Sequence, residues 1–289
     1  MSLSFLSECK DKVLNRIDAL LPDTNKIVSA MRYSALADSK CIRAGLVFAS
    51  GNLNEEISNA SLIDMAASIE LMHTYSLIHD DLPSMDNDEI RRGQASNHLK
   101  YNEATAILAG DALQALAYET IVSSLEITQV QKIHSIKALA NACGHEGMIL
   151  GQQYDLDAEK NEYNDIKKIH ELKTGKLIQV AMTMPHLGNN NQKNQLTILD
   201  EVGKDLGLAF QIMDDVLEVS SDSSTLGKSN QSDLINKKLT YVSAYGMQES
   251  IDQAKALSNA CISKLENSFN DNEVTSLLEL AKFMVEREN

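Results

Sequence analysis

The sequence contains very few residues that interrupt a helix. Its 289 residues include only 3 prolines and 13 glycines, whereas strand-rich folds need frequent turns. Apolar residues recur with a helical period over most of the chain. The sequence therefore predicts an all-α fold.

The periodic stretches give the expected order of helices. No linker rich in proline, glycine or serine separates them, so we expect one domain over residues 1–289, built as a bundle of long helices. Two polar loops interrupt the bundle, at 84–101 and 220–236. The expected helices are 2–20, 26–50, 60–82, 102–124, 128–156, 163–184 and 194–221, with further helix to about 287.

Composition excludes several classes of protein. The net charge of −15 argues against a surface that binds duplex nucleic acid. Four widely spaced cysteines without a CxxC pair argue against a structural zinc site or a disulfide framework, and favour a reducing cytoplasm. The sequence has no apolar run long enough to span a membrane, and its first residues lack the apolar core of a signal peptide.

Acidic residues gather where the apolar segment 60–82 ends. Asp80, Asp81, Asp86, Asp88 and Glu89 lie within ten positions, around a proline at position 83 that stops the helix. Like charges at this density cost free energy unless something neutralises them.

A second acidic group follows another apolar segment, at Asp214, Asp215 and Glu218. Asp214 and Glu218 are four residues apart and share a helix face. Acids near a helix C-terminus meet the negative end of the helix dipole. Such acids can simply be solvated, but two groups of this kind favour a bound cation. Oxygen ligands favour a hard metal ion, and the absence of EF-hand spacing favours Mg²⁺ over Ca²⁺.

Basic residues accompany the acids. Arg91 and Arg92 follow the first group directly, and Lys40 and Arg43 form a pair three residues apart. Such side chains are the usual ligands of a diphosphate, although each lysine alone can be an ordinary surface residue. The chain has no P-loop and no GxGxxG, so side chains and metal would hold the phosphates. The remaining candidates are Lys173, Lys228 and Lys238.

Taken together, these residues resemble the trans-prenyltransferases, or polyprenyl diphosphate synthases. The similarity is greatest to the short-chain bacterial type that makes farnesyl diphosphate. The resemblance covers nearly the whole chain, in order. It is carried by DDLPSMD at 80–86, RRG at 91–93, GQQYDL at 151–156, KTG at 173–175, DDVLE at 214–218, LGK at 226–228 and KKLTY at 237–241.

The resemblance implies a fold and a reaction. The fold is a single all-α domain of antiparallel helices around a deep central cavity, usually as a homodimer. The partners are isopentenyl diphosphate and an allylic diphosphate, dimethylallyl or geranyl, with three Mg²⁺ ions when substrate is bound. The allylic diphosphate ionises, isopentenyl diphosphate attacks the cation, and the chain grows by five carbons.

The resemblance also implies roles for individual positions. Asp80, Asp81 and Asp86 would hold two Mg²⁺ ions, and Asp214 with Glu218 a third. Lys173, Thr174 and Gln211 would be the catalytic residues, with Thr174 and Gln211 lining the reacting carbons and steadying the developing cation by their dipoles. The set for the allylic diphosphate is Arg91, Lys173, Lys228 and Lys238, and the set for isopentenyl diphosphate is Lys40, Arg43, His73 and Arg92. The alternative for His73 is a core histidine on an apolar helix.

Two positions depart from the family pattern. Where the family has GGKRLRP, this chain has DSKCIRA at 38–44, which keeps Lys40 and Arg43 but loses both glycines, the first arginine and the proline. The second acidic motif ends in Glu218 where aspartate is usual. The first change puts the binding of isopentenyl diphosphate in question.

The length of the product depends on what blocks the cavity below Asp80. Tyr75 and Ser76 lie about one helical turn before it. In the resembled family an aromatic residue at the fifth position before this motif accompanies a C15 product, so we expect farnesyl diphosphate. A deeper floor at Met72 or Leu71 would fit a C20 product, geranylgeranyl diphosphate. A terpene cyclase and a non-catalytic homologue are the more distant alternatives.

Overall fold

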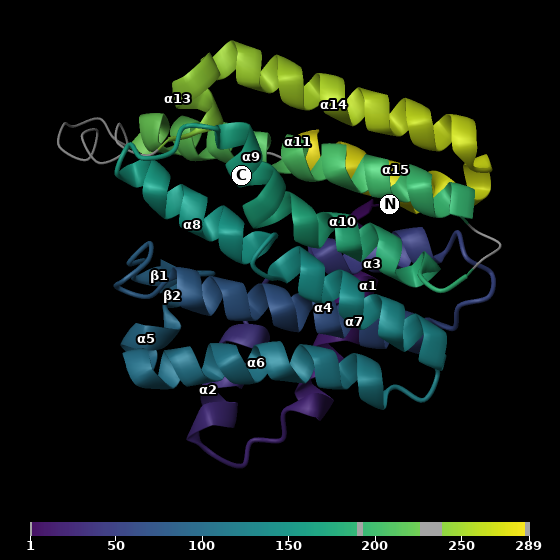
Figure 1. Cartoon of the computed structure of the whole chain (residues 1–289), viewed down its shortest axis with the longest axis horizontal. Coiled ribbons are helices and arrows are strands. Elements are labelled where there is room, and N and C mark those ends of the chain that lie inside the picture. Colours follow the sequence, from purple (N-terminus) through teal and green to yellow (C-terminus); the bar gives the residue numbers. More distant parts are fainter. Residues whose placement is uncertain (1, 190–192, 226–238, 287–289) are drawn as a thin grey trace. The chain divides into compact units, whose positions relative to one another are not determined.

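The computed structural model describes residues 2–189, 193–225 and 239–286. Its contacts divide the chain into two compact units, Met1–Ile136 and Lys137–Asn289. Each unit is built almost wholly of helices, as the scarcity of proline and glycine predicts (Figure 1). The prediction of one domain stays a prediction.

The first unit holds six helices of the described chain, the start of a seventh, and one small hairpin. In order, the elements are α1 (Ser2–Leu20), α2 (Lys26–Ala35), α3 (Ile42–Gly51), α4 (Asn59–Asp80), β1 (Ile90–Arg91), β2 (Gln94–Ala95), α5 (Asn97–Lys100), α6 (Glu103–Ser123) and the beginning of α7 (Gln129–Cys143). The two short strands pair antiparallel, Ile90 with Ala95 and Arg91 with Gln94.

Helix α4 is the centre of the first unit. It buries side chains on every face, among them Met65, Ile69 and Met72, which explains why its sequence is apolar throughout. Figure 1 shows α6 alongside it, running in the opposite direction. Small residues of α6 allow a close approach: a side chain at Gly110 would overlap the imidazole of His79.

The second unit contains the rest of the chain. Its elements are α8 (Met148–Glu159), α9 (Ile166–His170), the π-turn η1 (Glu171–Gly175), α10 (Lys176–Thr183), the 3₁₀ turn η2 (Met184–His186), α11 (Lys193–Thr225), α13 (Tyr241–Tyr245), α14 (Met247–Ser268) and α15 (Asp271–Glu286). Helix α11 is the longest described helix of this unit, and α10, α14 and α15 pack against it. The apolar cluster around Ile212 and Met213 joins α11 to α9, α13 and α14.

Several predicted boundaries were wrong. The stretch 26–50 is two helices, because residues 36–41 leave the helical path and Cys41 takes a left-handed conformation with φ 46°. The stretch 128–156 is also two helices, separated at 144–147. The loop 84–101 is not irregular, since it contains β1, β2 and α5. Helix α11 continues through 220–225, where a loop was expected.

Over the residues that the structure describes, no helix combines the length and the apolar character that a membrane span requires.

Candidate active site

The first acidic cluster is built by a tight turn at the end of α4. Asp80 is the last helical residue and Asp81 caps the helix. The chain then folds back, and the amide of Asp86 donates to the carbonyl of Asp80 over 2.9 Å. Asn87 completes the turn with φ 53°, a left-handed conformation that asparagine tolerates. Asp80 and Asp86, six positions apart in sequence, therefore lie together at one helix end.

Arg91 neutralises part of this cluster. Its Nε and Nη2 atoms donate to Asp81 Oδ1 at 2.8 and 2.5 Å, and Nη2 also donates to Asp88 Oδ2 at 2.6 Å. Asp81 is almost fully buried. Burial raises the pKa of this carboxyl above its ordinary value, while the guanidinium of Arg91 opposes that rise. Sequence reasoning did not find this ion pair.

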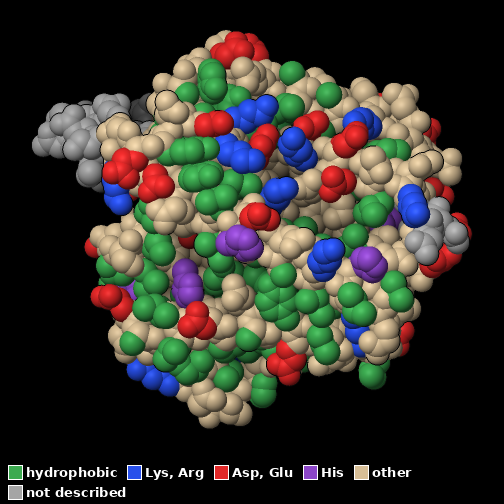
Figure 2. Space-filling view, in the orientation of Figure 1, with side chains coloured by type: hydrophobic (Ala, Val, Ile, Leu, Met, Phe, Trp, Pro, Cys, Tyr) green, Lys and Arg blue, Asp and Glu red, His purple; other side chains and the backbone are tan. Residues whose placement is uncertain are grey.

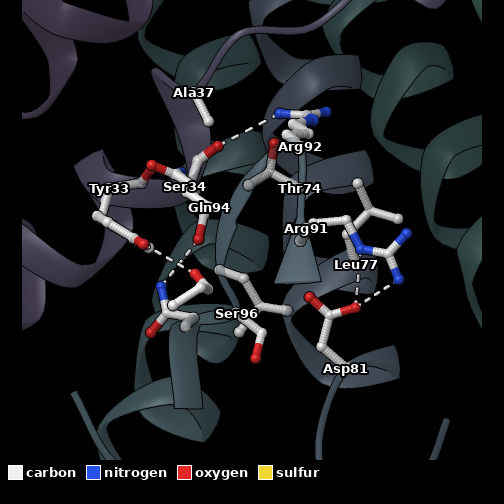
Figure 3. Close-up of a pocket in the computed structure, with 13 residues that line it drawn as sticks. Tyr33, Ser34, Ala37, Thr74, Leu77, Asp81, Arg91, Arg92, Gln94 and Ser96 are labelled. Carbon is white, nitrogen blue, oxygen red and sulfur yellow. Dashed lines mark hydrogen bonds and ion pairs between the residues drawn. The ribbon is translucent and has the colours of Figure 1, made fainter. Parts of the chain in front are cut away.

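The RRG motif forms the turn of the β1–β2 hairpin. Arg92 and Gly93 have φ of 54° and 74°, the two left-handed residues of a type I′ turn, which explains the glycine. Arg91 on the strand and Arg92 in the turn consequently leave the hairpin in different directions (Figure 3). Arg91 points to Asp81, and Arg92 Nη1 donates to the carbonyl of Ser34 at 3.3 Å.

Helix α2 holds this hairpin in place. Tyr33 donates its hydroxyl proton to Ala95 O at 2.8 Å, and Gln94 Nε2 donates to Tyr33 O at 3.1 Å. Asn97 Nδ2 donates to Ala30 O and to Ser34 Oγ, both at 2.8 Å. Between α2, α4 and the hairpin lies a small pocket. Arg91 and Arg92 both line it (Figure 3).

Three of the four residues expected at the isopentenyl diphosphate lie in one neighbourhood. Arg43 Nη1 lies 3.2 Å from His73 Nε2. Burial lowers the pKa of His73 well below its ordinary value, and the charges of Arg43 and Arg92 lower it further. His73 is therefore neutral near pH 7, and its Nε2 atom accepts a hydrogen bond from Arg43. Lys40 is exposed in the segment just before α3.

The two candidate chain-length residues differ in their surroundings. Tyr75 is buried, and its ring meets the ring of His79 edge to face at 5.4 Å. Ser76 donates its hydroxyl proton to the carbonyl of His73 at 2.8 Å, a bond within α4. Tyr75 is therefore the bulkier and more enclosed of the two.

In the second unit, Lys173 and Thr174 sit on the π-turn η1. Turns of this kind are rare and frequently mark functional sites. Two glycines allow neighbouring helices to reach it: a side chain at Gly151 of α8 would overlap the backbone of Lys173, and one at Gly207 of α11 would come within 2.8 Å of Gly175 Cα. Lys173 Nζ donates to the buried Asp155 at 2.7 Å.

A chain of hydrogen bonds links the π-turn to α11. Thr174 Oγ1 donates to Gln211 Oε1 at 2.7 Å, and Gln211 Nε2 donates to Asp215 Oδ1 at 3.3 Å. Asp215 Oδ2 also lies 2.9 Å from His170 Nε2 and accepts the amide of Tyr241 at 2.6 Å. The sequence predicted that Thr174 and Gln211 act together, and they are in direct contact.

Asp214 and Glu218 lie on one face of α11, half-buried and exposed respectively. The helix continues to Thr225, so these acids are not at its end, and the argument from the helix dipole fails for this cluster. Within the described residues, no three histidine, cysteine or acidic side chains converge into a ready-made metal cage.

Lys228 and Lys238 lie outside the described residues. The structure adds partners for the predicted residues: Asp88 bonds to Arg91, Asp155 to Lys173 and Asp215 to Gln211, and His170 bonds in turn to Asp215. The sequence placed Asp88 and Asp215 in the acidic groups but gave no role to Asp155 or His170. Asp155 and Asp215 lie inside the motifs GQQYDL and DDVLE, and this position was the sequence signal that could have identified them. Nothing in the sequence around His170 indicated its bond to Asp215.

Comparisons with known proteins agree with these features. The family model for polyprenyl synthetase matches residues 24–280, across both units. The farnesyl diphosphate synthase of Escherichia coli is 39% identical over 96% of this chain and 95% of its own length. The geranylgeranyl diphosphate synthase of Cyanophora paradoxa is 38% identical, with 99% and 97% covered.

Solved structures show the same fold. A synthase of Zymomonas mobilis described as FPP/GFPP synthase superposes with a TM-score of 0.87 at 32% identity, covering 98% of both chains. A geranyltransferase of Helicobacter pylori, solved with magnesium and isoprenyl diphosphate, gives a TM-score of 0.81 at 29% identity over 99% of this chain and 96% of its own. This chain belongs to the polyprenyl synthetase family of prenyltransferases.

Proposed function

We propose that this protein is a farnesyl diphosphate synthase, which joins isopentenyl diphosphate to dimethylallyl and then geranyl diphosphate. The observation that carries the proposal is the placement of an acidic turn, Asp80 to Asp86, next to a hairpin that carries two arginines. Oxygen ligands for a divalent cation and guanidinium groups for phosphate thus stand in one short segment.

The acidic residues fit Mg²⁺. This ion is usually held by one or two carboxylates, water and substrate phosphates, rather than by a cage of protein ligands. Asp80 and Asp86 supply carboxylates from one turn, and Asp214 and Glu218 supply two more from one helix face. Bound Mg²⁺ would stabilise the negative charge of the departing diphosphate. The number of ions, three, and a metal role for Asp81 belong to the proposal.

The cationic residues divide into two sets in the proposal. Arg43, His73 and Arg92, with Lys40, receive isopentenyl diphosphate, and Arg91 with Lys173 receives the allylic diphosphate, together with Lys228 and Lys238. The contact between Arg43 and the neutral His73 supports the first set. For the second, Lys173 is held by Asp155 on the π-turn, beside Thr174.

Thr174 and Gln211 carry the proposed stabilisation of the allylic cation. Their oxygen atoms lie 2.7 Å apart and are oriented through Gln211 by Asp215. Oriented dipoles of this kind stabilise developing charge without having to reorganise during the reaction. The released diphosphate takes up the proton in this scheme, so no side chain is assigned as the base.

Product length is a separate part of the proposal. The buried ring of Tyr75, backed by His79, supports a short cavity and a C15 product. Geranylgeranyl diphosphate synthase is the second candidate, favoured by a relative of that name at 38% identity. A terpene cyclase needs no second set of diphosphate ligands. The contact between Arg43 and His73, both assigned to such a second set, therefore argues against a cyclase. The altered segment 38–44 is the feature that favours a non-catalytic homologue.

A homodimer in the cytoplasm completes the proposal. Exposed apolar side chains recur along α6, the following loop and the start of α7: Ile107, Leu108, Val122, Leu125, Val130 and Ile133. Apolar side chains are visible over α6 on the face shown in Figure 2. Exposed apolar side chains that recur in this way support a surface covered by another subunit. Light scattering of the purified protein and of Ile133→Glu tests this part, and equal masses at the monomer value contradict it.

The experiment that tests the function is a product assay. The purified protein is mixed with Mg²⁺, isopentenyl diphosphate and dimethylallyl diphosphate, and product lengths are read by mass. Mainly C15 supports the proposal, and mainly C20 keeps the reaction but moves the floor of the cavity deeper. Omission of isopentenyl diphosphate is the control, because a cyclase consumes an allylic diphosphate without it. Absence of elongation with every allylic substrate contradicts the proposal.

A further inference from the structure

The N-terminus of α3 is not capped by the side chain of its own N-cap residue. Its N-cap residue, Cys41, has φ 46° and makes no side-chain hydrogen bond to the helix. The first turn of a helix has amide protons without helical partners. Here the first amide to find a partner within the helix is that of Gly45, which donates to Cys41 O.

Glu70 of α4 supplies the missing cap from another helix. Its Oε1 atom accepts the amide proton of Ala44 at 2.9 Å, and the side chain is 4% exposed. A carboxylate at this position is favoured by the positive end of the helix dipole. A buried charge that accepts a backbone amide fixes the position of that amide closely.

The same face of α4 also contacts Arg43, the residue just before Ala44. Glu70 and His73 are three positions apart, so they lie on one face of α4. Glu70 holds the amide of Ala44, while His73 lies 3.2 Å from Arg43 Nη1. The first turn of α3 is thus attached to α4 at two consecutive residues, Arg43 and Ala44.

The segment before α3 is held by contacts of the residues that depart from the family pattern. Asp38 forms an ion pair with Lys10 of α1. Ser39 Oγ lies 3.1 Å from Cys41 Sγ. At position 44 the family's proline has no amide proton, whereas Ala44 has one and gives it to Glu70. The bond between Glu70 and Ala44 therefore depends on a residue that this chain does not share with the family pattern.

We infer that Glu70 is a positioning residue, which fixes the first turn of α3 so that Lys40 and Arg43 meet the diphosphate of isopentenyl diphosphate. This inference rests on the proposed function. Glu70 does not touch the substrate in this scheme. Its bond to Ala44 replaces, in this chain, the backbone rigidity that proline gives at position 44 in the family pattern.

The experiment is a double-mutant cycle in the full-length protein with Glu70→Ala, Ala44→Pro and both together. Glu70→Ala should raise the KM for isopentenyl diphosphate about tenfold, the factor expected for loss of one charge-assisted hydrogen bond. The KM for the allylic diphosphate and kcat should stay within about twofold. In the Ala44→Pro background the same substitution should have little effect, because position 44 then has no proton to give.

Glu70→Gln is the conservative control, since its amide oxygen still accepts the Ala44 proton, and its KM should remain within about threefold of the wild type. Melting temperatures of all variants separate positioning from misfolding. Equal effects of Glu70→Ala with alanine and with proline at position 44 would overturn the inference. So would an equal rise of KM for both substrates.

Calorimetric binding of isopentenyl diphosphate separates this inference from the proposed function. If the wild type binds it but does not elongate, and Glu70→Ala weakens binding about tenfold, the proposed function fails and the role of Glu70 stands. If the wild type elongates and Glu70→Ala binds equally well, the inference fails and the function stands. A wild type that neither binds nor elongates overturns both.

Discussion

Arg91 and Asp81 form a two-point contact, with Nε and Nη2 of the arginine 2.8 and 2.5 Å from one carboxylate oxygen of the aspartate. The aspartate caps α4 and the arginine lies on β1, so this contact joins the acidic turn to the hairpin. Asp81 is buried, and the guanidinium is the group that makes its charge tolerable there.

Arg91→Ala should destabilise the protein by roughly 3 kcal/mol at neutral pH, because it leaves a buried carboxylate without its cation. Burial already raises the folded-state pKa of Asp81 above 3.8. The folded state therefore binds more protons than the unfolded state above pH 3.8, and stability falls as pH rises through that window. Without Arg91 the folded-state pKa of Asp81 rises further and this pH window widens. The loss of stability caused by Arg91→Ala should therefore become smaller toward acid pH. Urea unfolding between pH 4 and 8 measures this.

Arg92→Ala is the matched control for that prediction, because Arg92 makes one hydrogen bond of 3.3 Å to a backbone carbonyl. Its loss of stability should be below about 1 kcal/mol and should not depend on pH in the same way. If both variants lost the same free energy of unfolding at every pH, the contact with Asp81 would not be the cause.

His73 should make stability depend on pH on the acid side of neutrality. Its folded-state pKa lies well below 6.5, through burial and then through Arg43 and Arg92. The unfolded state therefore binds more protons below pH 6.5, and stability falls as pH drops, by at most about 1.4 kcal/mol per pH unit. The free energy of unfolding of His73→Gln, measured by urea unfolding, should depend less on pH over this range. The control is His134→Gln, at an exposed histidine, which should keep the wild-type slope.

Thr174→Val should lower kcat about ten- to a hundredfold with little change in either KM, because it removes the hydroxyl that Gln211 orients. The substitution keeps the shape of the side chain but removes the donor to Gln211 Oε1, so the melting temperature should also fall by several degrees. Thr183→Val is the control: that threonine is equally buried, but its hydroxyl bonds only to backbone carbonyls of its own helix. Equal losses of kcat would show that the effect belongs to packing.

Tyr75→Ala should move the product from C15 toward C20, because it removes a buried ring below Asp80. It should also destabilise the protein by about 3 kcal/mol, the usual cost of emptying a buried aromatic site. Tyr75→Phe keeps the ring and should keep C15. Mass analysis of the products decides, and an unchanged C15 product from Tyr75→Ala would move the floor to Met72 or Leu71.

Gly151→Ala should damage the π-turn, because the added methyl group overlaps the backbone of Lys173. We expect a melting temperature several degrees lower and a loss of product formation larger than Thr174→Val causes. Gly151→Ser should be at least as harmful, since its side chain is larger. Wild-type activity in Gly151→Ala would show that α8 and the π-turn can separate without cost.

The sequence was sufficient for the helical fold, because the fold follows from local patterns of apolar residues and helix breakers. The helix 60–82 and its stop at Pro83 match α4 and its end at Asp80. The break between α2 and α3 was not predictable, since Ile42 and its neighbours continue the apolar period and Cys41 is an unusual residue for a left-handed cap. The end of α11 was placed too early, because its polar last turns look like a loop.

The sequence provides candidate site residues, but it does not provide the contacts that they make. Thr174 and Gln211 were paired through the resemblance alone, and they touch. That Asp81 would face Arg91 depends on a tight turn and a type I′ hairpin, whose geometry the local sequence pattern does not specify. Bonds such as Glu70 to Ala44 join residues 26 positions apart and leave no local signal.

The π-turn at Glu171–Gly175 has a consequence for changes in chain length. A π-turn carries one residue more than the helix around it needs, and each residue turns a helix by about 100°. Deletion of one residue between Glu171 and Gly175 would restore a regular helix, yet would rotate α10 and everything it packs against relative to α9. Point substitutions are therefore a safer route for engineering this segment than insertions or deletions, even those that make it look more regular.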